Sequence, residues 1–446
     1  MFETVDRLLE LAVARGAAGA EVYAERAVSR RVKVFRGEVE ELTAARRRGV
    51  GLRVFQNGAV GYGYSSDLSA QALDDVVDTA LANARVADRD PDAVLPSADG
   101  PAAAVDVFDA RLEQATDEQR IDLGLAVERA ALAADPRVKS VDESVYADSD
   151  TEVFLASTGG LRGSYREGHC YAFAYVLAEQ DGQIETGLSF TVGRVLDDLD
   201  PEHCGTEAAE RAVQLLGATK PQTMKATAVL DPFVSASFFG VLSSALTGEA
   251  VQKGRSLFAG RVGDEVAGSI VTLVDDGIHP DGLASAPFDG EGVPCRRTPL
   301  VDAGVLQGFL HNTRSAHRDG RSSTGNGVRG SYQTTPGVGP TNLVLSGPQT
   351  PLDDLIGGIE RGVLVTNAIG IHSGANPVSG EFSVGISGLL IEAGRVTTPL
   401  REVTMAGDIV SMLRGIVVLG DDARWVPMGS ILTPSVAIEG VSIGGA

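Results

Sequence analysis

Glycine is the residue that most limits what this chain can fold into. The sequence contains 54 glycines among 446 residues, roughly twice the usual share of about 7 %. Glycine favours tight turns and destabilises helix interiors, so this content predicts many strands joined by short turns and argues against a helical bundle. The hydrophobic fraction of 43 % is ordinary for a folded protein. A prior of roughly 150 residues per domain allows two or three domains.

The charge balance excludes several classes of partner. The chain carries 60 acidic and 38 basic side chains, which gives a formal net charge of −22. Such a surface repels nucleic-acid phosphates and anionic lipid, so we expect no direct contact with nucleic acid or with a membrane surface. In addition, no window approaches the roughly 20 apolar residues that a membrane span requires.

The N-terminus and the cysteines predict a cytoplasmic protein. The segment Met1–Asp6 lacks the positive charges and the apolar run of a signal peptide. The cysteines are too few and too scattered for a disulfide framework or a cysteine-based zinc knuckle; they are Cys170, Cys204 and Cys295.

The first part of the chain predicts a helix, several strands and a second helix. Apolar residues at helical spacing predict a helix over the first 15 residues, which Gly16 ends. Asn57-Gly58 between two alternating stretches is a strong hairpin signal. We expect strands at 21–27, 31–35, 50–54 and 60–64, and a helix over 68–84.

The same order of elements recurs after a linker over residues 86–104, which is rich in Asp, Pro and Ala. Thr116 and Gln119 have the spacing of a capping box at the start of a helix, and Asp181-Gly182 predicts a second hairpin turn. The expected strands lie at 141–146, 152–157, 170–178 and 183–191, before a helix over 206–216. We interpret residues 1–220 as one α/β region in which helix, four strands and helix are duplicated.

From Ala226 onward, short apolar stretches alternate with Gly, Asp and Pro. This pattern predicts a Gly-rich, largely antiparallel, barrel-like domain over 221–446, and therefore an α+β protein overall. Asp231-Pro232 is an N-cap followed by Pro at the first helical position, and we expect this helix to end at Gly248. A shorter helix is expected over 408–413. The expected strands lie at 270–274, 300–310, 342–345, 363–366, 386–391 and 436–443.

The residues that often carry chemistry form no strong motif. None of the histidines lies in an H-E-x-x-H arrangement, and a hydrogen-bonded or surface position is favoured for each; they are His169, His203, His279, His311, His317 and His372. Ser322–Gly330, with Arg321 and Arg329, is polar enough to hold an anion, but it lacks the P-loop lysine and its strand–helix context. A surface loop is therefore the favoured interpretation of this segment.

Residues 370–383 allow two interpretations that the sequence leaves open. Glycines beside His372, Asn376 and Ser379 let another backbone approach closely while offering donors and acceptors. An extended peptide could therefore bind here through main-chain hydrogen bonds. The alternative is a plain glycine-rich connection within the barrel-like domain.

Several motifs together resemble one known family. The first is the run Gly248–Phe258 followed by Gly263-Asp264, and Asp275-Asp276-Gly277 comes next. Pro287–Gly292 reads P-F-D-G-E-G, and Asn376–Phe382 matches N-P-x-S-G-x-F. These segments resemble the TldD/PmbA (TldE) family, also called modulator of DNA gyrase or peptidase U62. The resemblance covers essentially the whole chain.

The resemblance implies a metallopeptidase family but a chain without its metal site. TldD-type subunits carry H-E-x-x-x-H on a helix, and a further cysteine near the C-terminus. In this sequence Phe239 and Ser244 stand in place of the histidines, Gly240 in place of the glutamate, and Leu419 in place of the cysteine. Phe and Leu carry no metal donor, and Gly cannot act as the general base. The chain thus resembles the PmbA/TldE-type subunit, for which we expect no catalytic residue and no bound metal.

For such a subunit the resemblance implies a heterodimer with a TldD-type chain that alone holds zinc. Its expected role is to complete a chamber and to bind unfolded or extended peptides for maturation or degradation. The residues expected to contact substrate are His372, Gly374, Asn376, Ser379 and Phe382.

Two other hypotheses remain from the sequence. One is a stand-alone regulatory protein that binds peptides or proteins as a homodimer and has no proteolytic role. The other is an autonomous enzyme whose metal ligands have moved to His279, Asp281 and Asp275, which would require every supporting contact to be rebuilt as well.

Overall fold

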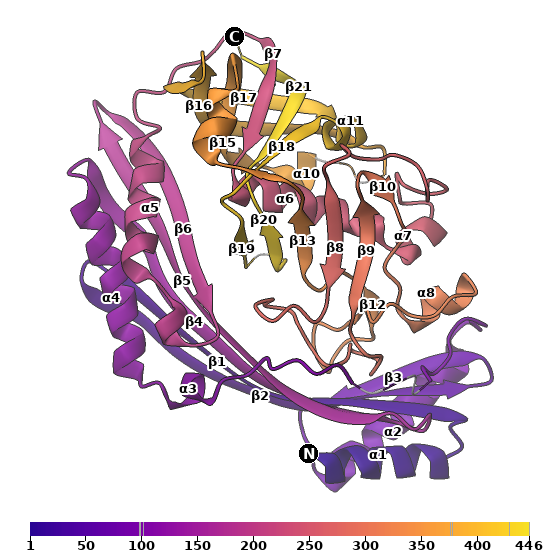
Figure 1. The fold of residues 1–446 in the computed structure, drawn as a ribbon. Helices are drawn as coiled ribbons and strands as arrows, with labels where there is room; N and C mark the ends of the chain where they lie inside the picture. Colours follow the sequence, from indigo (N-terminus) through magenta and orange to yellow (C-terminus); the bar gives the residue numbers. More distant parts are fainter. Residues whose placement is uncertain (98–99, 101, 375, 377, 428, 446) are drawn as a thin grey trace.

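The computed structural model describes residues 1–97, 100, 102–374, 376, 378–427 and 429–445. The chain has the predicted α+β fold: a broad antiparallel sheet formed by the N-terminal half curves around the C-terminal half, which contains a closed β-barrel and a second sheet (Figure 1). Among the described residues, no helix combines the length and the apolar character needed to cross a membrane.

The N-terminal sheet has six antiparallel strands in the order β3-β2-β1-β4-β5-β6. Helices cover one face of this sheet, and the C-terminal half faces the other (Figure 1). The elements are α1 (Phe2–Ala14), β1 (Gly19–Phe35), β2 (Glu38–Gln56), β3 (Ala59–Ser65), α2 (Ala70–Val86), α3 (Ala110–Gln114), α4 (Asp117–Ala134), β4 (Val138–Ser157), β5 (Arg162–Gln180), β6 (Gln183–Gly193) and α5 (Pro201–Val213).

Two halves of this sheet have the same order of elements, and each has its own core. One core lies beneath α1 and α2, and the other beneath α4 and α5. The hairpin turns are confirmed, because Asn57 and Gly58 have φ angles of 53° and 77°, and Asp181 and Gly182 have 52° and 78°, the left-handed values of a type I′ turn. The capping box of Thr116 and Gln119 is also confirmed.

The expected count of four strands in each half is wrong, because each half has three. The stretches 21–27 and 31–35 belong to the single strand β1, and 141–146 and 152–157 belong to β4. The middle of β1 is polar, which interrupted the apolar pattern in the sequence. That middle pairs with the equally polar middle of β4, where Arg30 forms an ion pair with Asp148 at 2.9 Å.

The C-terminal half contains a barrel closed by five strands, β7-β15-β16-β17-β21, with β21 pairing back to β7. Only the β7–β15 contact in this ring is parallel, which confirms a largely antiparallel, barrel-like domain. The barrel and its appended strands comprise β7 (Met224–Leu230), β14 (Gln349–Thr350), α9 (Leu352–Gly357), β15 (Arg361–Ile369), α10 (Ile371–Gly374), β16 (Glu381–Glu392), β17 (Arg395–Asp408), α11 (Ile409–Arg414), β18 (Ile416–Gly420) and β21 (Val436–Gly444).

A second sheet of order β10-β9-β8-β13-β20-β19 lies between the barrel and one end of the N-terminal sheet (Figure 1). Its elements and neighbours are α6 (Pro232–Ser243), α7 (Gly248–Gln252), β8 (Thr272–Asp276), β9 (Arg297–Asp302), β10 (Val305–Leu306), α8 (Thr313–Arg318), β11 (Gly327–Val328), β12 (Gly337–Val338), β13 (Leu343–Ser346), β19 (Arg424–Val426) and β20 (Ile431–Thr433). The division of the chain into domains 1–220 and 221–446 stays a prediction.

One expected helix boundary is wrong. The helix that begins after Asp231 ends at Ser243, a 3₁₀ turn continues to Leu246, and Gly248 begins α7 instead of ending α6. Thr247 caps α7 through a hydrogen bond from the Ala250 N–H, so the chain changes direction where a single helix was expected. The short helix near 408 is confirmed as α11, with Asp408 as its N-cap.

Candidate functional site

Helix α6 runs through the centre of the C-terminal half and is buried on almost every side. The Asp231 side chain accepts a hydrogen bond from the Val234 N–H at 2.9 Å, and Pro232 occupies the first turn, which together start the helix. A helix that is apolar around most of its circumference is typical of a core position. Because α6 is packed on almost every side, it rigidly positions the few of its residues that remain accessible.

One narrow stripe of α6 and the following turn remains accessible. It consists of Ser237, Gly240, Val241 and Ser244, whereas Phe238, Phe239, Leu242 and Ser243 are buried. The three- and four-residue spacing places these positions on one side of the helix. The hydroxyls of Ser237 and Ser244 donate hydrogen bonds to the carbonyl oxygens of Phe233 and Val241, each at 2.9 Å.

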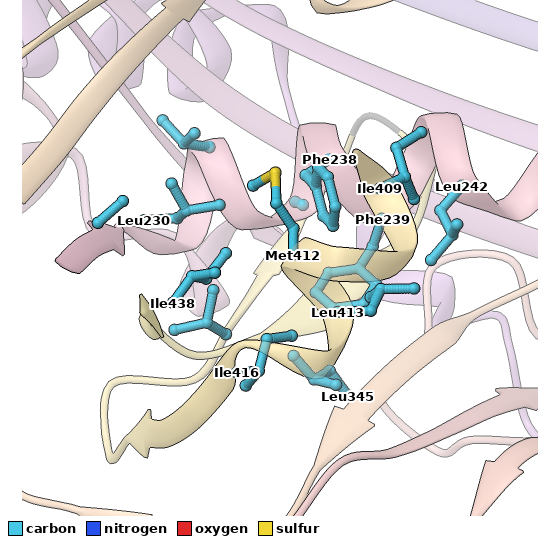
Figure 2. Close-up of a cluster of buried hydrophobic side chains, with 14 of the residues drawn as sticks. Leu230, Phe238, Phe239, Leu242, Leu345, Ile409, Met412, Leu413, Ile416 and Ile438 are labelled. Atoms are coloured by element: carbon cyan, nitrogen blue, oxygen red, sulfur yellow. The ribbon is translucent and has the colours of Figure 1, made fainter. Parts of the chain in front are cut away.

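The four positions expected to lack metal ligands do not all meet in space. Gly240 and Ser244 share the accessible stripe, but Phe239 is 1 % exposed and Leu419 is fully buried. Figure 2 shows Phe239 in the apolar cluster beside Leu413 of α11. Leu419 lies in β18 opposite Val436, which lies opposite Leu230 at the end of β7. Two of the four side chains therefore belong to the core.

These residues do not fit a zinc ion. The accessible stripe offers two hydroxyls but no imidazole, thiolate or carboxylate, the donors that zinc requires. Cys170 and Cys204 lie in the core beneath α4 and α5, and the thiol of Cys295 donates a hydrogen bond to Gly325 O. Among the described residues, no group of three or more His, Cys, Asp or Glu side chains is placed to hold a metal.

The predicted substrate-binding segment lies beside α6. The Asn376 side chain accepts hydrogen bonds from the Val378 and Ser379 N–H groups, which forms a tight turn. Asn376 and Ser379 are exposed, while Phe382 is buried and its ring lies 6.5 Å from that of Phe238 in α6. Phe382 thus packs in the core of the structure described here.

Two further predicted contacts lie in α10. Gly374 is half-buried, and its N–H donates a hydrogen bond to Gly370 O. The side chain of His372 is outside the described residues, as are Ala375 and Pro377. A contact between any of the five predicted residues and a substrate stays a prediction.

A cavity of about 340 Å³ lies between α6 and the N-terminal sheet. Its volume falls within the range of roughly 300–1,000 Å³ that is usual for ligand sites. The wall combines residues of β5, β6, α5 and the turn after α5 with residues of α6 and β15. They are Tyr175, Thr186, Gly187, Leu188, Arg211, Leu215, Phe233, Val234, Ser237, Thr366, Asn367, Ala368 and Ile369.

Two strand edges border this cavity. β15 pairs with β16 as far as Ile369 but with β7 only as far as Val365, so on the β7 side Thr366–Ile369 has no strand neighbour in the described part of the chain. β6 is the last strand of the N-terminal sheet. Backbone groups at a free strand edge can pair with an extended peptide. The predicted segment 370–382 follows directly after this end of β15.

Ion pairs fix the two sides of the cavity relative to each other. Arg211 of α5 pairs with Asp231 at 2.6 Å and donates a hydrogen bond to Thr366 O. Arg424 pairs with Glu207 at 2.7 Å, and both guanidinium groups lie within 5 Å of the Phe233 ring centroid. Burial raises the pKa of Asp231, although Arg211 opposes the shift. The cavity therefore has a preformed shape.

The family-like motif Pro287–Gly292 is part of a buried ion-pair network between the two halves of the chain. Arg53 donates hydrogen bonds to Glu21 at 2.7 Å and to Glu291 at 3.0 Å. Arg329 pairs with Glu21 and donates a hydrogen bond to Gly290 O. Sequence reasoning missed this network, because its members lie far apart along the chain. Its role is to hold the 287–292 loop against β1 and β2.

The other candidate chemical groups are also engaged in structural contacts. Asp275 is 1 % exposed and accepts hydrogen bonds from Asn326 and Thr341, and burial raises its pKa to about 6. His279 lies edge-on to Trp425. Arg329, which was considered together with Ser322–Gly330 for anion binding, is bound to Glu21. These contacts favour neither a relocated metal centre nor an anion site.

Glu167 of β5 gives a pH-dependent prediction. Its side chain lies on the face toward the C-terminal half, the same face on which Tyr165 packs against Phe288. Burial raises its pKa from 4.5 to about 7, with Arg194 opposing the shift and Glu25 adding to it. The native state therefore binds a proton on the Glu167 carboxyl more tightly than the unfolded state does. The stability that this protonation contributes is fully present below about pH 4.5 and is lost as the pH rises through about 7.

We therefore expect Glu167→Gln to raise the free energy of unfolding by about 1–3 kcal/mol at pH 8 and to change it little at pH 5. Urea unfolding at both pH values measures the effect. Glu179→Gln, at an exposed position of the same strand, is the matched control. An equal gain at both pH values would show that the Glu167 proton is not the cause.

Three family models match the chain: PmbA/TldA metallopeptidase domain 1 over residues 20–84, the central domain over 110–216 and the C-terminal domain over 223–445. Metalloprotease PmbA of Escherichia coli O157:H7 is 30 % identical over 449 residues, which cover 98 % of this chain and 96 % of the relative. A metalloprotease TldD homolog of Haemophilus influenzae is 30 % identical over 432 residues, which cover 89 % and 87 %.

Solved structures show the same fold. A putative modulator of DNA gyrase from Thermotoga maritima superposes with a TM-score of 0.92 at 28 % identity, covering 99 % of this chain and 100 % of the other. TldE from Thermococcus kodakarensis also gives a TM-score of 0.92, at 23 % identity, with the same coverage. The second likeness concerns the fold alone.

Proposed function

This chain belongs to the PmbA/TldD metallopeptidase family, and from that premise we propose that it is a PmbA/TldE-type, non-catalytic subunit. In this proposal it forms a heterodimer with a TldD-type chain that supplies the zinc ion. Its own role is to complete the chamber and to hold an extended peptide for proteolytic maturation or degradation.

One observation carries this proposal: the accessible stripe of α6 lacks metal donors but lies next to a preformed cavity. Ser237 of that stripe lines the cavity, while Gly240 and Ser244 continue along the same side of the helix. Hydroxyls that are bound to their own helix cannot activate water as a metal centre does. On the β7 side the backbone of Asn367–Ile369 has no strand neighbour in the described part of the chain, and together with the apolar wall it favours binding of an extended chain.

The subunit role is tested by mixing purified proteins. We expect the isolated chain to hold less than a stoichiometric amount of zinc and to cleave no peptide. A mixture with a TldD-type subunit should form a complex that contains zinc and cleaves unfolded peptides. Metal analysis and a fluorescent-peptide assay measure both properties. One tightly bound zinc per isolated chain, or no complex with the TldD-type subunit, would overturn the proposal.

The cavity itself is tested by filling it. Ser237→Trp places a large ring in the cavity, so we expect kcat/KM of the complex for an unfolded peptide to fall by about tenfold or more, mainly through KM. Thr397→Trp is the matched control, because Thr397 is exposed on β17 and its hydroxyl also donates a hydrogen bond to a backbone carbonyl. Equal activity of the two variants would remove the cavity from the proposed peptide path.

A further inference from the structure

The first half of β2 has no strand neighbour on one side. β1 pairs with β2 from Glu38 to Phe55, whereas β3 pairs with β2 only from Val50 onward. In the described part of the chain, Glu38–Arg48, called the β2 edge below, therefore presents backbone groups with no strand beside them. At roughly 3.3 Å per residue this edge is about 36 Å long. An open strand edge can pair with another chain, and natural proteins usually shorten, cover or charge such edges.

The β2 edge is exposed along its whole length, including two apolar side chains. Val39 is 40 % exposed and Leu42 is 51 % exposed. They lie opposite Val34 and Val32 of β1, both fully buried in the core beneath α4 and α5. The apolar face of the sheet therefore continues onto the β2 edge without cover. A further strand beside it would remove this apolar surface from water.

The charges of the β2 edge are divided by sign. Glu38, Glu40 and Glu41 begin it, and Arg46, Arg47 and Arg48 end it. Within the chain, Glu40 pairs with Lys33, Glu41 with Arg31 at 3.9 Å and Arg47 with Glu25. Glu38, Arg46 and Arg48, by contrast, have no ion pair among the described residues. Arg48 lies directly opposite Arg26 of β1, and Arg26 is itself paired with Glu152, so no acidic partner lies across from Arg48 on β1.

We propose that the β2 edge is a self-association surface that pairs antiparallel with the β2 edge of a second copy of this chain. A two-fold axis near Thr43 places the acidic end of each copy beside the basic end of the other. A two-fold interface requires such a self-complementary patch. Parallel pairing would instead place acidic against acidic and basic against basic. The dimer contains a continuous sheet in which the two β2 strands are neighbours and the two Leu42 side chains lie near the axis.

This dimer does not depend on the proposed role in a metallopeptidase. It uses the outer edge of the N-terminal sheet, whereas the cavity is lined by β5, β6, α5, α6 and β15. The two proposals can therefore fail separately.

Sedimentation equilibrium of the full-length protein at low and high ionic strength tests the dimer. We expect a dimer that weakens as salt increases. Arg46→Glu with Arg48→Glu makes the β2 edge acidic along nearly its whole length and should weaken dimerisation about tenfold or more. Glu38→Arg with Glu41→Arg makes it mostly basic and should do the same. An equimolar mixture of the two double variants should again dimerise, with one copy of each in every dimer by native mass spectrometry.

Arg85→Glu with Arg89→Glu is the control, because both residues are exposed at the end of α2 and beyond it and the net charge changes equally. This variant should dimerise as the parent does. A monomeric parent, a dimer unaffected by R46E/R48E, or a mixture that stays monomeric would overturn the proposal. If the β2 edge binds only a TldD-type chain, the parent protein would be a monomer. It would bind the TldD-type chain, and R46E/R48E would not. This result would also overturn the proposed self-association.

Discussion

Replacing Glu291 with alanine is expected to lower the free energy of unfolding by about 3–5 kcal/mol. Glu291 is 1 % exposed, and its carboxylate accepts hydrogen bonds from Arg53 at 3.0 Å and from the Thr313 N–H at 2.7 Å. The network contains two arginines and two glutamates, so its formal charges cancel. Removing Glu291 leaves an uncompensated guanidinium charge in the interior and a backbone donor without its acceptor.

Urea unfolding followed through the fluorescence of Trp425, the single tryptophan, measures this loss. Glu291→Gln keeps the shape of the side chain and an oxygen for Thr313, so its cost should be smaller than that of Glu291→Ala. Glu10→Ala removes an exposed glutamate of α1 and should change stability by at most about 0.5 kcal/mol. A Glu291→Ala variant as stable as Glu10→Ala would mean that the network does not hold the two halves together.

The ion-pair network around Glu291 could not be predicted from the sequence. The motif Pro287–Gly292 marks the family, but nothing local indicates that Glu291 meets Arg53 or that Arg329 meets Glu21. These partners are separated by more than 200 residues along the chain. Ion pairs between distant segments depend on tertiary packing, which composition and spacing do not encode.

Local signals, by contrast, predicted many elements of the fold. The positive φ angles required at Asn57-Gly58 and Asp181-Gly182 restrict those positions to few residues. The capping box at Thr116 and the N-cap at Asp231 are equally local. The long strands β1 and β4 were divided in the prediction because polar residues in their middles pair with each other across the sheet. From sequence alone, polar residues in the middle of a strand cannot be distinguished from a loop between two strands, because the residues that pair with them on the neighbouring strand are not known.

The candidate site was predicted in part. The sequence located α6, but a helix apolar on most sides does not show which stripe stays accessible. The structure separates Gly240 and Ser244 on that stripe from Phe239 in the core. The cavity wall could not be predicted, because Tyr175, Leu188 and Arg211 come from the N-terminal region and meet α6 only after folding.

The final prediction concerns installing metallopeptidase residues on α6. The triple variant F239H/G240E/S244H is expected to hold no stoichiometric zinc and to be about 3–5 kcal/mol less stable than the parent. Phe239 packs beside Leu413 and Phe238, with ring centroids of the two phenylalanines 5.6 Å apart (Figure 2). Position 239 lies about 100° around the helix from position 240 and about 140° from position 244. In this packing an imidazole at 239 would therefore point into the apolar core and not toward an ion on the accessible stripe.

The double variant G240E/S244H separates the two effects. A Cβ at Gly240 would contact only the Ile431 side chain, at 3.5 Å, and Ser244 is exposed, so this variant should stay within about 1 kcal/mol of the parent. Phe239→His alone should then account for nearly all of the lost stability. Metal analysis after dialysis and urea unfolding measure the two properties. Stoichiometric zinc in the triple variant would mean that position 239 can turn toward the accessible stripe, and that loss of the ligands alone separates this chain from a metal-binding relative.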